Sequence, residues 1–332
     1  MRIGMNPQKQ DKPLDLDCHH RIIVVVYVPE SDSAFYKHSF EVFKASLTSI
    51  KTSINEKAKI TIVNNGSNTE VTSYLNECYA LKVIDTLINH STNIGKIDAL
   101  IGAARGAREP LLTLADSDIL FKKGWQEAVE EVFLNFKDVG SVSPISVRAS
   151  ELYCTSATLK RIWLKRLKFR YEAIPENFDD YNKYMDSINW DHETDAQLKW
   201  PVVEANAVKA LVGSGHQVLT INRQVLFETV PFEPSLILVG NHSEYKYVDE
   251  PIDKSGRLRL STYHNYAYHM GNTVEDWMTA ILEDNQTKSV APIMDFNESL
   301  LKKTSFLKSI KRKWYTGKRL LYKTIFLTFY KR

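Results

Sequence analysis

Residues 112–121 read Leu-Thr-Leu-Ala-Asp-Ser-Asp-Ile-Leu-Phe, an apolar strand that ends in two aspartates, Asp116 and Asp118. Alternate side chains of an extended chain point to the same side, so both carboxylates face one way where the strand leaves its sheet. Two carboxylates in this position can hold Mg²⁺ or Mn²⁺ against a diphosphate, because these hard cations prefer oxygen ligands. The stretch therefore predicts a sheet with a metal and phosphate site at a strand end.

Apolar runs typical of strands alternate with helical periods around this stretch. The predicted strands cover residues 22–28, 60–63, 83–88, 111–115 and 142–145. Between them, apolar residues recur every three or four positions over 36–50, 97–104 and 125–136, which predicts amphipathic helices. This repeat predicts an α/β fold with a mostly parallel central sheet and helices on both faces. In such sheets ligands bind beyond the carboxyl ends of the strands.

The composition is that of an ordinary folded chain. Its 332 residues are 43% hydrophobic, enough for one large core or two smaller ones. The longest apolar run, 22–28, falls far short of the roughly 20 residues that span a bilayer. Residues 1–20 are polar and lack the apolar core of a secretory signal, so we expect a cytoplasmic chain. The three cysteines have no metal-like spacing, which favours neither a disulfide framework nor a zinc site.

Short polar motifs stand at strand ends or helix starts in a fixed order. They are Val28-Pro29-Glu30, Val63-Asn64-Asn65-Gly66-Ser67, Asn93-Ile94-Gly95-Lys96-Ile97-Asp98-Ala99, Leu114-Ala115-Asp116-Ser117-Asp118, Val248-Asp249-Glu250 and His269-Met270-Gly271-Asn272. This order resembles the family 2 glycosyltransferases, which are nucleotide-sugar enzymes with the GT-A fold. The resemblance covers roughly residues 20 to 275.

The resemblance implies a divalent metal ion, Mn²⁺ or Mg²⁺, at the Asp-x-Asp motif. In the family, the carboxylates that correspond to Asp116 and Asp118 bind the ion and the sugar-diphosphate, and Ser117 lies between them. A histidine before a glycine-containing turn, here His269, completes the metal or diphosphate site, and neutral imidazole is a suitable ligand for Mn²⁺. The ion would neutralise the charge that grows on the leaving diphosphate.

The remaining donor contacts are predicted along the first three strand ends. Lys96 follows Gly95 at a predicted helix start, where free amides and the helix dipole favour a phosphate; the alternative is a solvated lysine. Asp98 matches a family position near the nucleotide, or is an acid that favours the dipole. Pro29 and Glu30 fall in the region that contacts the ribose, although the acid follows the proline directly.

Two asparagines replace the acidic pair that ends the second strand in the family and reads the base. Asn64 and Asn65 can donate as well as accept, whereas a carboxylate only accepts, so the preference for uracil is expected to shift or relax. The alternative is that this Asn-Gly-Ser sequence is simply a turn.

An inverting transfer needs a base that takes the proton of the acceptor hydroxyl. The family's acidic cluster falls at Asp249 and Glu250, and we predict Asp249 as the first candidate and Glu250 as the second.

The C-terminal segment is electrostatically distinct. Residues 302–332 hold eleven Lys and Arg and no acid, which leaves 32 basic against 40 acidic side chains in residues 1–301. Leu307, Ile310, Trp314, Leu321 and Ile325 fall near helical spacing, which favours a helix lying in an anionic membrane surface. The alternative is a helix pair packed on the catalytic domain. Nucleic acid is not expected as a partner, because no reading motif accompanies the charge.

Four regions follow from these observations. Residues 1–20 form an extension, 21–145 the nucleotide-sugar-binding half, 146–295 the acceptor-binding and catalytic half, and 296–332 the basic tail. Within the third region, a basic stretch at 160–170 and an acidic one at 176–195 are either a solvated helix and loop that cover the sheet or an acceptor-binding insertion.

We therefore expect a metal-dependent inverting glycosyltransferase at the inner membrane face. It would move a sugar from a nucleotide-diphosphate donor to a hydroxyl of a glycan or lipid-linked acceptor. The rival hypothesis is a non-catalytic nucleotide-sugar or glycan-binding protein of the same fold.

Overall fold

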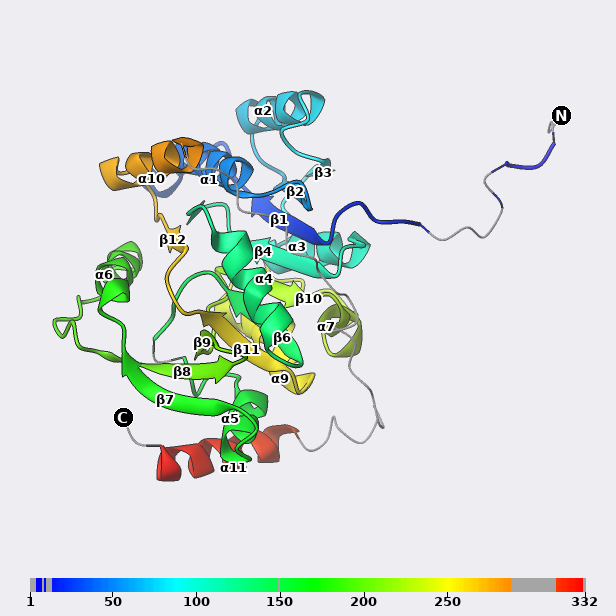
Figure 1. Ribbon diagram of the computed structural model, residues 1–332. Helices are drawn as coiled ribbons and strands as arrows, with labels where there is room; N and C mark the ends of the chain where they lie inside the picture. Colours follow the sequence, from blue (N-terminus) through cyan, green and yellow to red (C-terminus); the bar gives the residue numbers. More distant parts are fainter. Residues whose placement is uncertain (1–3, 8, 10–13, 149, 288–314, 331–332) are drawn as a thin grey trace.

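A mixed ten-stranded sheet forms the centre of the molecule (Figure 1). The computed structural model describes residues 4–7, 9, 14–148, 150–287 and 315–330. The sheet order is β3 (Thr86–His90), β2 (Ala58–Asn65), β1 (His20–Val26), β4 (Leu111–Ala115), β10 (Val218–Asn222), β6 (Val139–Ser143), β11 (Leu258–Thr262), β9 (Val208–Val212), β8 (Lys199–Ala205) and β7 (Lys168–Ala173). From β3 to β4 all neighbours are parallel, whereas β10 runs antiparallel between β4 and β6.

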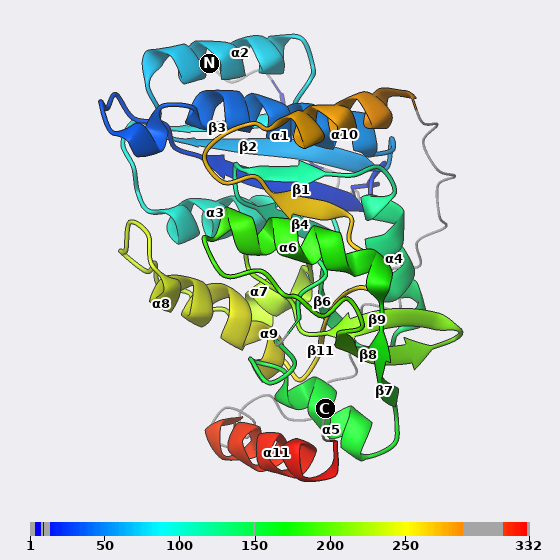
Figure 2. The same cartoon turned by 90° about the vertical axis from the view of Figure 1, so that its left-hand side faces the viewer.

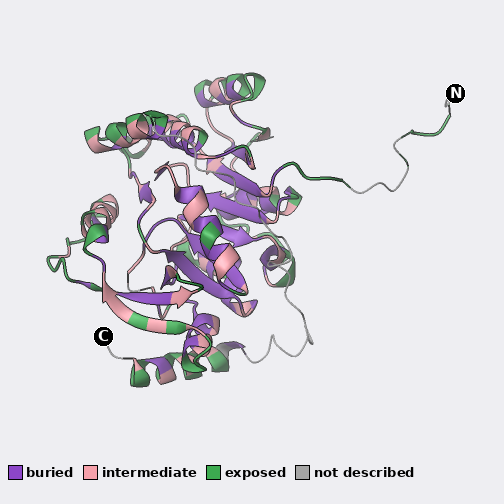
Figure 3. Ribbon diagram, in the orientation of Figure 1, coloured by how far each residue is buried: buried purple, intermediate pink, exposed green. Residues whose placement is uncertain are grey.

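Helices cover both faces of the parallel half, as predicted. On one face, Ile22 and Val24 of β1 pack with α1 (Ser39–Ser53), α2 (Thr69–Ala80) and α4 (Trp125–Asn135). On the other face, Ile23 packs with α3 (Lys96–Gly106), α7 (Gln224–Glu228) and α9 (Glu250–Lys254). Figure 3 shows the central strands buried between these layers, which is why their sequences are continuous apolar runs. The predicted α/β, GT-A type of fold is confirmed, with antiparallel strands extending the sheet beyond β4.

The segment after residue 146 contributes more to the sheet than its sequence indicates. It holds α5 (Ser156–Trp163) and α6 (Phe178–Ser187), but β7, β8 and β9 join the sheet edge by antiparallel pairing. Lys168 and Arg170 of β7 form ion pairs with Glu204 of β8 across the strands. The interpretation of 160–170 as part of a solvated cover was therefore wrong for β7, because an exposed edge strand carries charges that pair across the ladder.

A separate two-stranded sheet brings residues 267–269 next to the Asp-x-Asp motif. β5 (Ile119–Phe121) pairs antiparallel with β12 (Ala267–His269), and His269 lies opposite Ile119. This pairing places His269 next to Asp118. After β12, α10 (Asp276–Thr287) packs on α1. The remaining short helices are η1 (Ala34–Tyr36), η2 (Pro175–Asn177), α8 (Asn241–Glu244) and the π-helix η3 (Tyr245–Asp249).

The described part of the C-terminal tail is a helix, α11 (Tyr315–Phe329), that packs on α5 at the end of the molecule opposite α2 (Figures 1 and 2). Phe326 is buried and its ring meets Phe169 of β7. The Tyr315 hydroxyl donates to Asp253 at 3.0 Å. The alternative prediction for the tail, a helix packed on the domain, therefore holds for residues 315–330. Leu307, Ile310 and Trp314 lie outside the described residues. None of the described helices is long and apolar enough to span a membrane.

Candidate active site

A cavity of about 500 Å³ opens at the carboxyl ends of β1, β2 and β4, as the topology of the sheet predicts. Its floor is polar and its rim is largely aromatic or aliphatic. The lining residues are Val25, Tyr27, Phe35, Tyr36, Ser39, Val42, Asn65, Asn93, Lys96, Asp116, Ser117, Asp118, Leu238, Val239, Gly271 and Asn272. Four of the predicted donor residues, Asn65, Lys96, Asp116 and Ser117, therefore face one space together with the predicted metal ligand Asp118.

The second aspartate of the Asp-x-Asp motif lies beside the predicted histidine. Asp118 Oδ2 lies 3.3 Å from His269 Nε2, about the separation of two ligands on one ion. Burial alone would raise the pKa of Asp118, but the hydrogen bond and charge of His269 outweigh it and lower that pKa. The second carboxylate oxygen of Asp118, Oδ1, is buried without a hydrogen-bond partner. An ionised carboxylate with an unsatisfied buried oxygen fits a cation, because such an oxygen is costly when left unpaired.

Lys96 lies between Asp116 of the Asp-x-Asp motif and the carboxylate of Glu244. Its Nζ lies 2.8 Å from Asp116 Oδ1 and 2.6 Å from Glu244 Oε1. Burial would lower the pKa of Lys96, but these two carboxylates raise it, so the ammonium stays charged. For Asp116, burial dominates and raises the pKa despite Lys96. The predicted phosphate-binding cation thus stands at the first residue of α3, beside the metal motif.

The two asparagines that end β2 have different surroundings. Asn64 is buried and its amide is used by Thr72, Asn89 and the Ser67 backbone. Asn65 lines the cavity, donates to Asn93 Oδ1 at 2.9 Å and accepts from the Ile94 backbone at 3.1 Å. Asn64 is therefore committed to the turn that follows β2, as the alternative interpretation of this motif stated, while Asn65 is in place to meet a ligand.

Other predicted donor residues lie away from the cavity. Asp98 accepts from the backbones of Ser235 and Leu236 at 2.6 and 2.8 Å, so it fixes the loop that supplies Leu238 and Val239 to the rim. Glu30 is exposed, and neither it nor Pro29 lines the cavity. The structure therefore does not bring Asp98, Glu30 and Pro29 to the cavity as the prediction expected. Asp98 is hydrogen-bonded to a loop, and Glu30 is exposed.

The predicted base Asp249 is unsuited to that role by its burial. Its carboxylate is fully buried, with Oδ1 2.6 Å from Arg259 Nη2. Oδ2 accepts from the Tyr153 hydroxyl at 3.0 Å and lies 3.2 Å from His216 Nδ1. An acceptor hydroxyl cannot reach a carboxylate enclosed in this way. The alternative base, Glu250, pairs with Lys254 and accepts from the Tyr245 hydroxyl at 3.0 Å, and neither of these partners lines the cavity.

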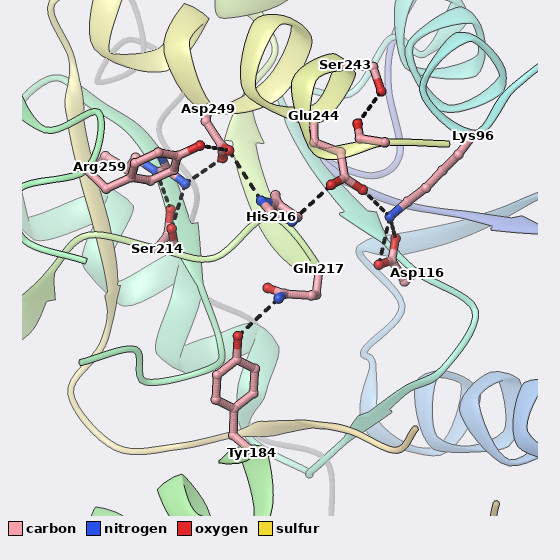
Figure 4. Close-up of polar contacts among 12 residues, drawn as sticks. Lys96, Asp116, Tyr184, Ser214, His216, Gln217, Ser243, Glu244, Asp249 and Arg259 are labelled. Carbon is pink, nitrogen blue, oxygen red and sulfur yellow. Dashed lines mark hydrogen bonds and ion pairs between the residues drawn. The ribbon is translucent and has the colours of Figure 1, made fainter. Parts of the chain in front are cut away.

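The sequence analysis missed Glu244 and His216, which the structure places between Asp249 and the metal motif (Figure 4). Glu244 Oε1 contacts Lys96, and its Oε2 lies 3.1 Å from His216 Nε2. Burial would raise the pKa of Glu244, but His216 and Lys96 lower it to about 2. No local pattern marks this glutamate, and the Asp249-Glu250 pair close by drew the prediction instead. The signal that could have pointed to Glu244 is its position in the same helical run as Glu250, six residues earlier.

The fold and the site together define a class of protein. A parallel half-sheet with an Asp-x-Asp motif, a lysine and a histidine around a strand-end cavity is the arrangement of a nucleotide-sugar transferase of the GT-A type. Residues 34–190, a little under half of the chain, match the family model described as glycosyl transferase family 2. The resemblance of the sequence is thus confirmed, and the chain is a glycosyltransferase.

Three solved structures are similar to the chain. A mannosyltransferase from Pyrobaculum calidifontis, in complex with GDP-Man and Mn²⁺, is 14% identical, with 97% of this chain and 80% of that one covered at a TM-score of 0.45. Staphylococcus aureus TarS 1-349 with UDP is 12% identical, with 85% and 69% covered at 0.40. GalNAc-T7 with UDP, GalNAc and Mn²⁺ is 13% identical, with 76% and 43% covered at 0.44. No curated protein sequence matches the chain.

Proposed function

We propose that the chain is a metal-dependent inverting glycosyltransferase that uses a nucleotide-diphosphate sugar and a hydroxyl acceptor. The observation that carries this proposal is that Asp116, Asp118 and Lys96 line one cavity, and that Lys96 pairs with both Asp116 and the buried Glu244 behind it. This arrangement supports a cation-binding motif, a phosphate-binding cation and a carboxylate base close to one another.

Mn²⁺ or Mg²⁺ would be held by Asp116, Asp118 and His269, with oxygens of the donor diphosphate completing its shell. When bound, the ion supplies positive charge against the leaving diphosphate. The unpartnered Oδ1 of Asp118 supports this assignment. Among the described residues, no cluster of three or more His, Cys, Asp or Glu is close enough to hold a metal on its own. Asp118 and His269 are in contact in this structure, whereas Asp116 is paired with Lys96 and would have to leave it to join them.

Lys96 has a role in binding the donor. Its ammonium stands between Asp116 and Glu244 and would pair with a diphosphate oxygen when the donor enters the cavity. The aromatic rim, with Tyr27, Phe35 and Tyr36, offers ring faces to the base or the sugar. Of the two predicted asparagines, only Asn65 lines the cavity. Because its amide can both donate and accept, it would tolerate bases other than uracil.

Glu244 is the base in this proposal, in place of Asp249 and Glu250. Its carboxylate is ionised and contacts Lys96, which lines the cavity beside Asp116, so in this proposal an acceptor hydroxyl reaches Glu244 from the side of that lysine. The hydroxyl oxygen forms the new bond to that carbon while its proton passes to Glu244. The bond from the carbon to the diphosphate oxygen breaks, and its electron pair leaves with the nucleotide. Attack opposite the nucleotide inverts the anomeric centre.

Titration calorimetry with UDP, GDP, dTDP, ADP and CDP, each with and without Mn²⁺, tests the donor site. We expect one or more of them to bind at least about tenfold more tightly with Mn²⁺, because the ion links the diphosphate to the Asp-x-Asp motif. The nucleotide that binds most tightly identifies the donor class. Binding that is the same with and without Mn²⁺ would contradict metal dependence, and no binding at all would contradict the donor site.

The acceptor in this proposal is a glycan or lipid-linked hydroxyl at the inner membrane face. Support comes from exposed aliphatic side chains: Leu236, Leu238 and Val239 stand on the loop at the rim of the cavity. On α11, Leu320 and Leu327 are exposed, as are Lys318 and Lys323, whereas Phe326 is buried. Apolar side chains flanked by lysines suit an anionic membrane surface.

The double variant Lys318→Glu/Lys323→Glu is expected to weaken binding to phosphatidylserine vesicles by at least about 30-fold in a sedimentation assay. Each basic residue near an anionic surface contributes about 1 kcal/mol. Lys51→Glu/Lys82→Glu changes two exposed lysines elsewhere on the molecule and serves as the control. Equal losses in both variants, or no binding of the unaltered chain, would contradict an anchor on α11.

A further inference from the structure

A row of side chains with alternating charge runs from the buried sheet to the metal motif (Figure 4). Each contact in it is an ion pair between 2.6 and 3.2 Å. Its members, in order, are Arg259, Asp249, His216, Glu244, Lys96 and Asp116. The proposed reaction uses the last three of them. It gives no role to the first three, although two of these are completely buried and therefore costly to place there.

His216 is the link between the two parts of the row. It precedes β10, and its side chain is about one quarter exposed. Nδ1 lies 3.2 Å from Asp249 Oδ2 and Nε2 lies 3.1 Å from Glu244 Oε2, so the ring bridges two carboxylates. A neutral imidazole carries one N–H and could donate to only one of them, whereas imidazolium donates to both. The geometry thus favours the charged ring.

The surroundings of His216 agree with this charge state. Burial would lower its pKa, but Asp249 and then Glu244 raise it to about 9. Each of these carboxylates also faces a cation on its far side: Arg259 of β11 for Asp249 and Lys96 of α3 for Glu244. Tyr153 donates its hydroxyl to the same Asp249 oxygen that faces His216. Because the pKa is raised above its usual value of about 6.5, the imidazolium is complete at neutral pH and is lost as the pH rises through about 9.

We propose that His216 is a positioning residue of the transferase: held by Asp249, it fixes one oxygen of Glu244 so that the other is free to take the acceptor proton. This inference rests on the proposed function and adds a group to it. In the structure that other oxygen contacts Lys96. When a donor diphosphate competes for the lysine, His216 is the remaining cation that holds Glu244 in place. Asp249 and Arg259 act through His216, which accounts for a buried ion pair beside the site.

The variant His216→Gln tests this role. Glutamine can donate a hydrogen bond but carries no charge and does not titrate. We expect kcat for nucleotide release from the sugar donor to fall about 10- to 100-fold, with the KM for the donor unchanged, since a charge-assisted hydrogen bond to the base is lost. We also expect the unaltered enzyme to lose activity as the pH rises through about 9, and the variant to lack this decline. His242→Gln, two residues before Glu244 and exposed, is the matched control and should behave as the unaltered enzyme.

A second measurement is independent of turnover. In histidine-selective NMR, the His216 ring of the unaltered chain is expected to titrate near pH 9, and in Glu244→Gln it should titrate lower, because one carboxylate partner is gone. An active enzyme whose His216→Gln variant keeps both kcat and the alkaline decline would overturn the inference while leaving the proposed function intact. So would a ring that titrates below 7. An unaltered chain that binds no nucleotide and releases none would instead refute the proposed function, and the positioning role with it.

Discussion

Glu244→Gln is expected to lower the rate of sugar transfer by about 10²- to 10⁴-fold, the usual contribution of a general base. The amide keeps the size of the carboxylate and can still accept from His216, so the fold and the cavity should remain. The KM for the donor should not rise, because the diphosphate is bound by the metal motif and Lys96. The measurement is the steady-state release of nucleotide from the donor that calorimetry identifies.

Glu250→Gln is the matched control for this change. Its carboxylate lies in the same helical run but faces Lys254 and Tyr245. We expect transfer close to that of the unaltered enzyme. A large loss in Glu250→Gln together with a small one in Glu244→Gln would return the base to the residue that the sequence predicted and would remove Glu244 from the mechanism.

Asp118→Ala is expected to weaken Mn²⁺-dependent nucleotide binding by at least about 100-fold. The change removes a carboxylate that would hold the ion in the proposed site and leaves His269 without its charged partner. Calorimetry with the preferred nucleotide measures the loss, and binding without Mn²⁺ should change little. Asp276→Ala, at the exposed start of α10, is the control. Unchanged affinity with Mn²⁺ in Asp118→Ala would place the metal elsewhere.

The position of the two aspartates in the cavity could be predicted from the sequence because its signal is local. Asp116 and Asp118 are two residues apart at the end of an apolar strand, and the alternation of side chains along a strand fixes their direction. Strands β1, β2 and β4 were predicted for a similar reason: each is buried on both sides and reads as an apolar run. Lys96 likewise follows a glycine at a helix start. In each case, residues adjacent in the sequence are enough to predict the position of the side chain or strand.

The base and its surroundings depend on contacts between distant segments. Asp249 looks like a catalytic acid in the sequence, but Arg259 on β11 and His216 before β10 enclose it. Glu244 is a single acid at the end of the short helix α8, and its contacts with Lys96 and His216, far away in the chain, are what mark it. The edge strand β7 was missed because alternating charges on an exposed strand resemble those of a solvated helix. None of these partners can be paired by spacing alone.

The π-helix η3 has a consequence for how the site can change in evolution. Glu244 and Asp249 are five residues apart, and the backbone N–H of Glu250 bonds to the carbonyl of Tyr245, a step of five residues. In an α-helix, five residues turn through about 500°, so two such side chains would diverge by roughly 140°. The wider turn of η3 instead lets both meet one imidazole. Loss of a single residue between 245 and 248 would restore an ordinary helical turn and break the row of charges with every catalytic side chain still present. This segment should therefore tolerate substitutions of its exposed residues far better than any change in its length.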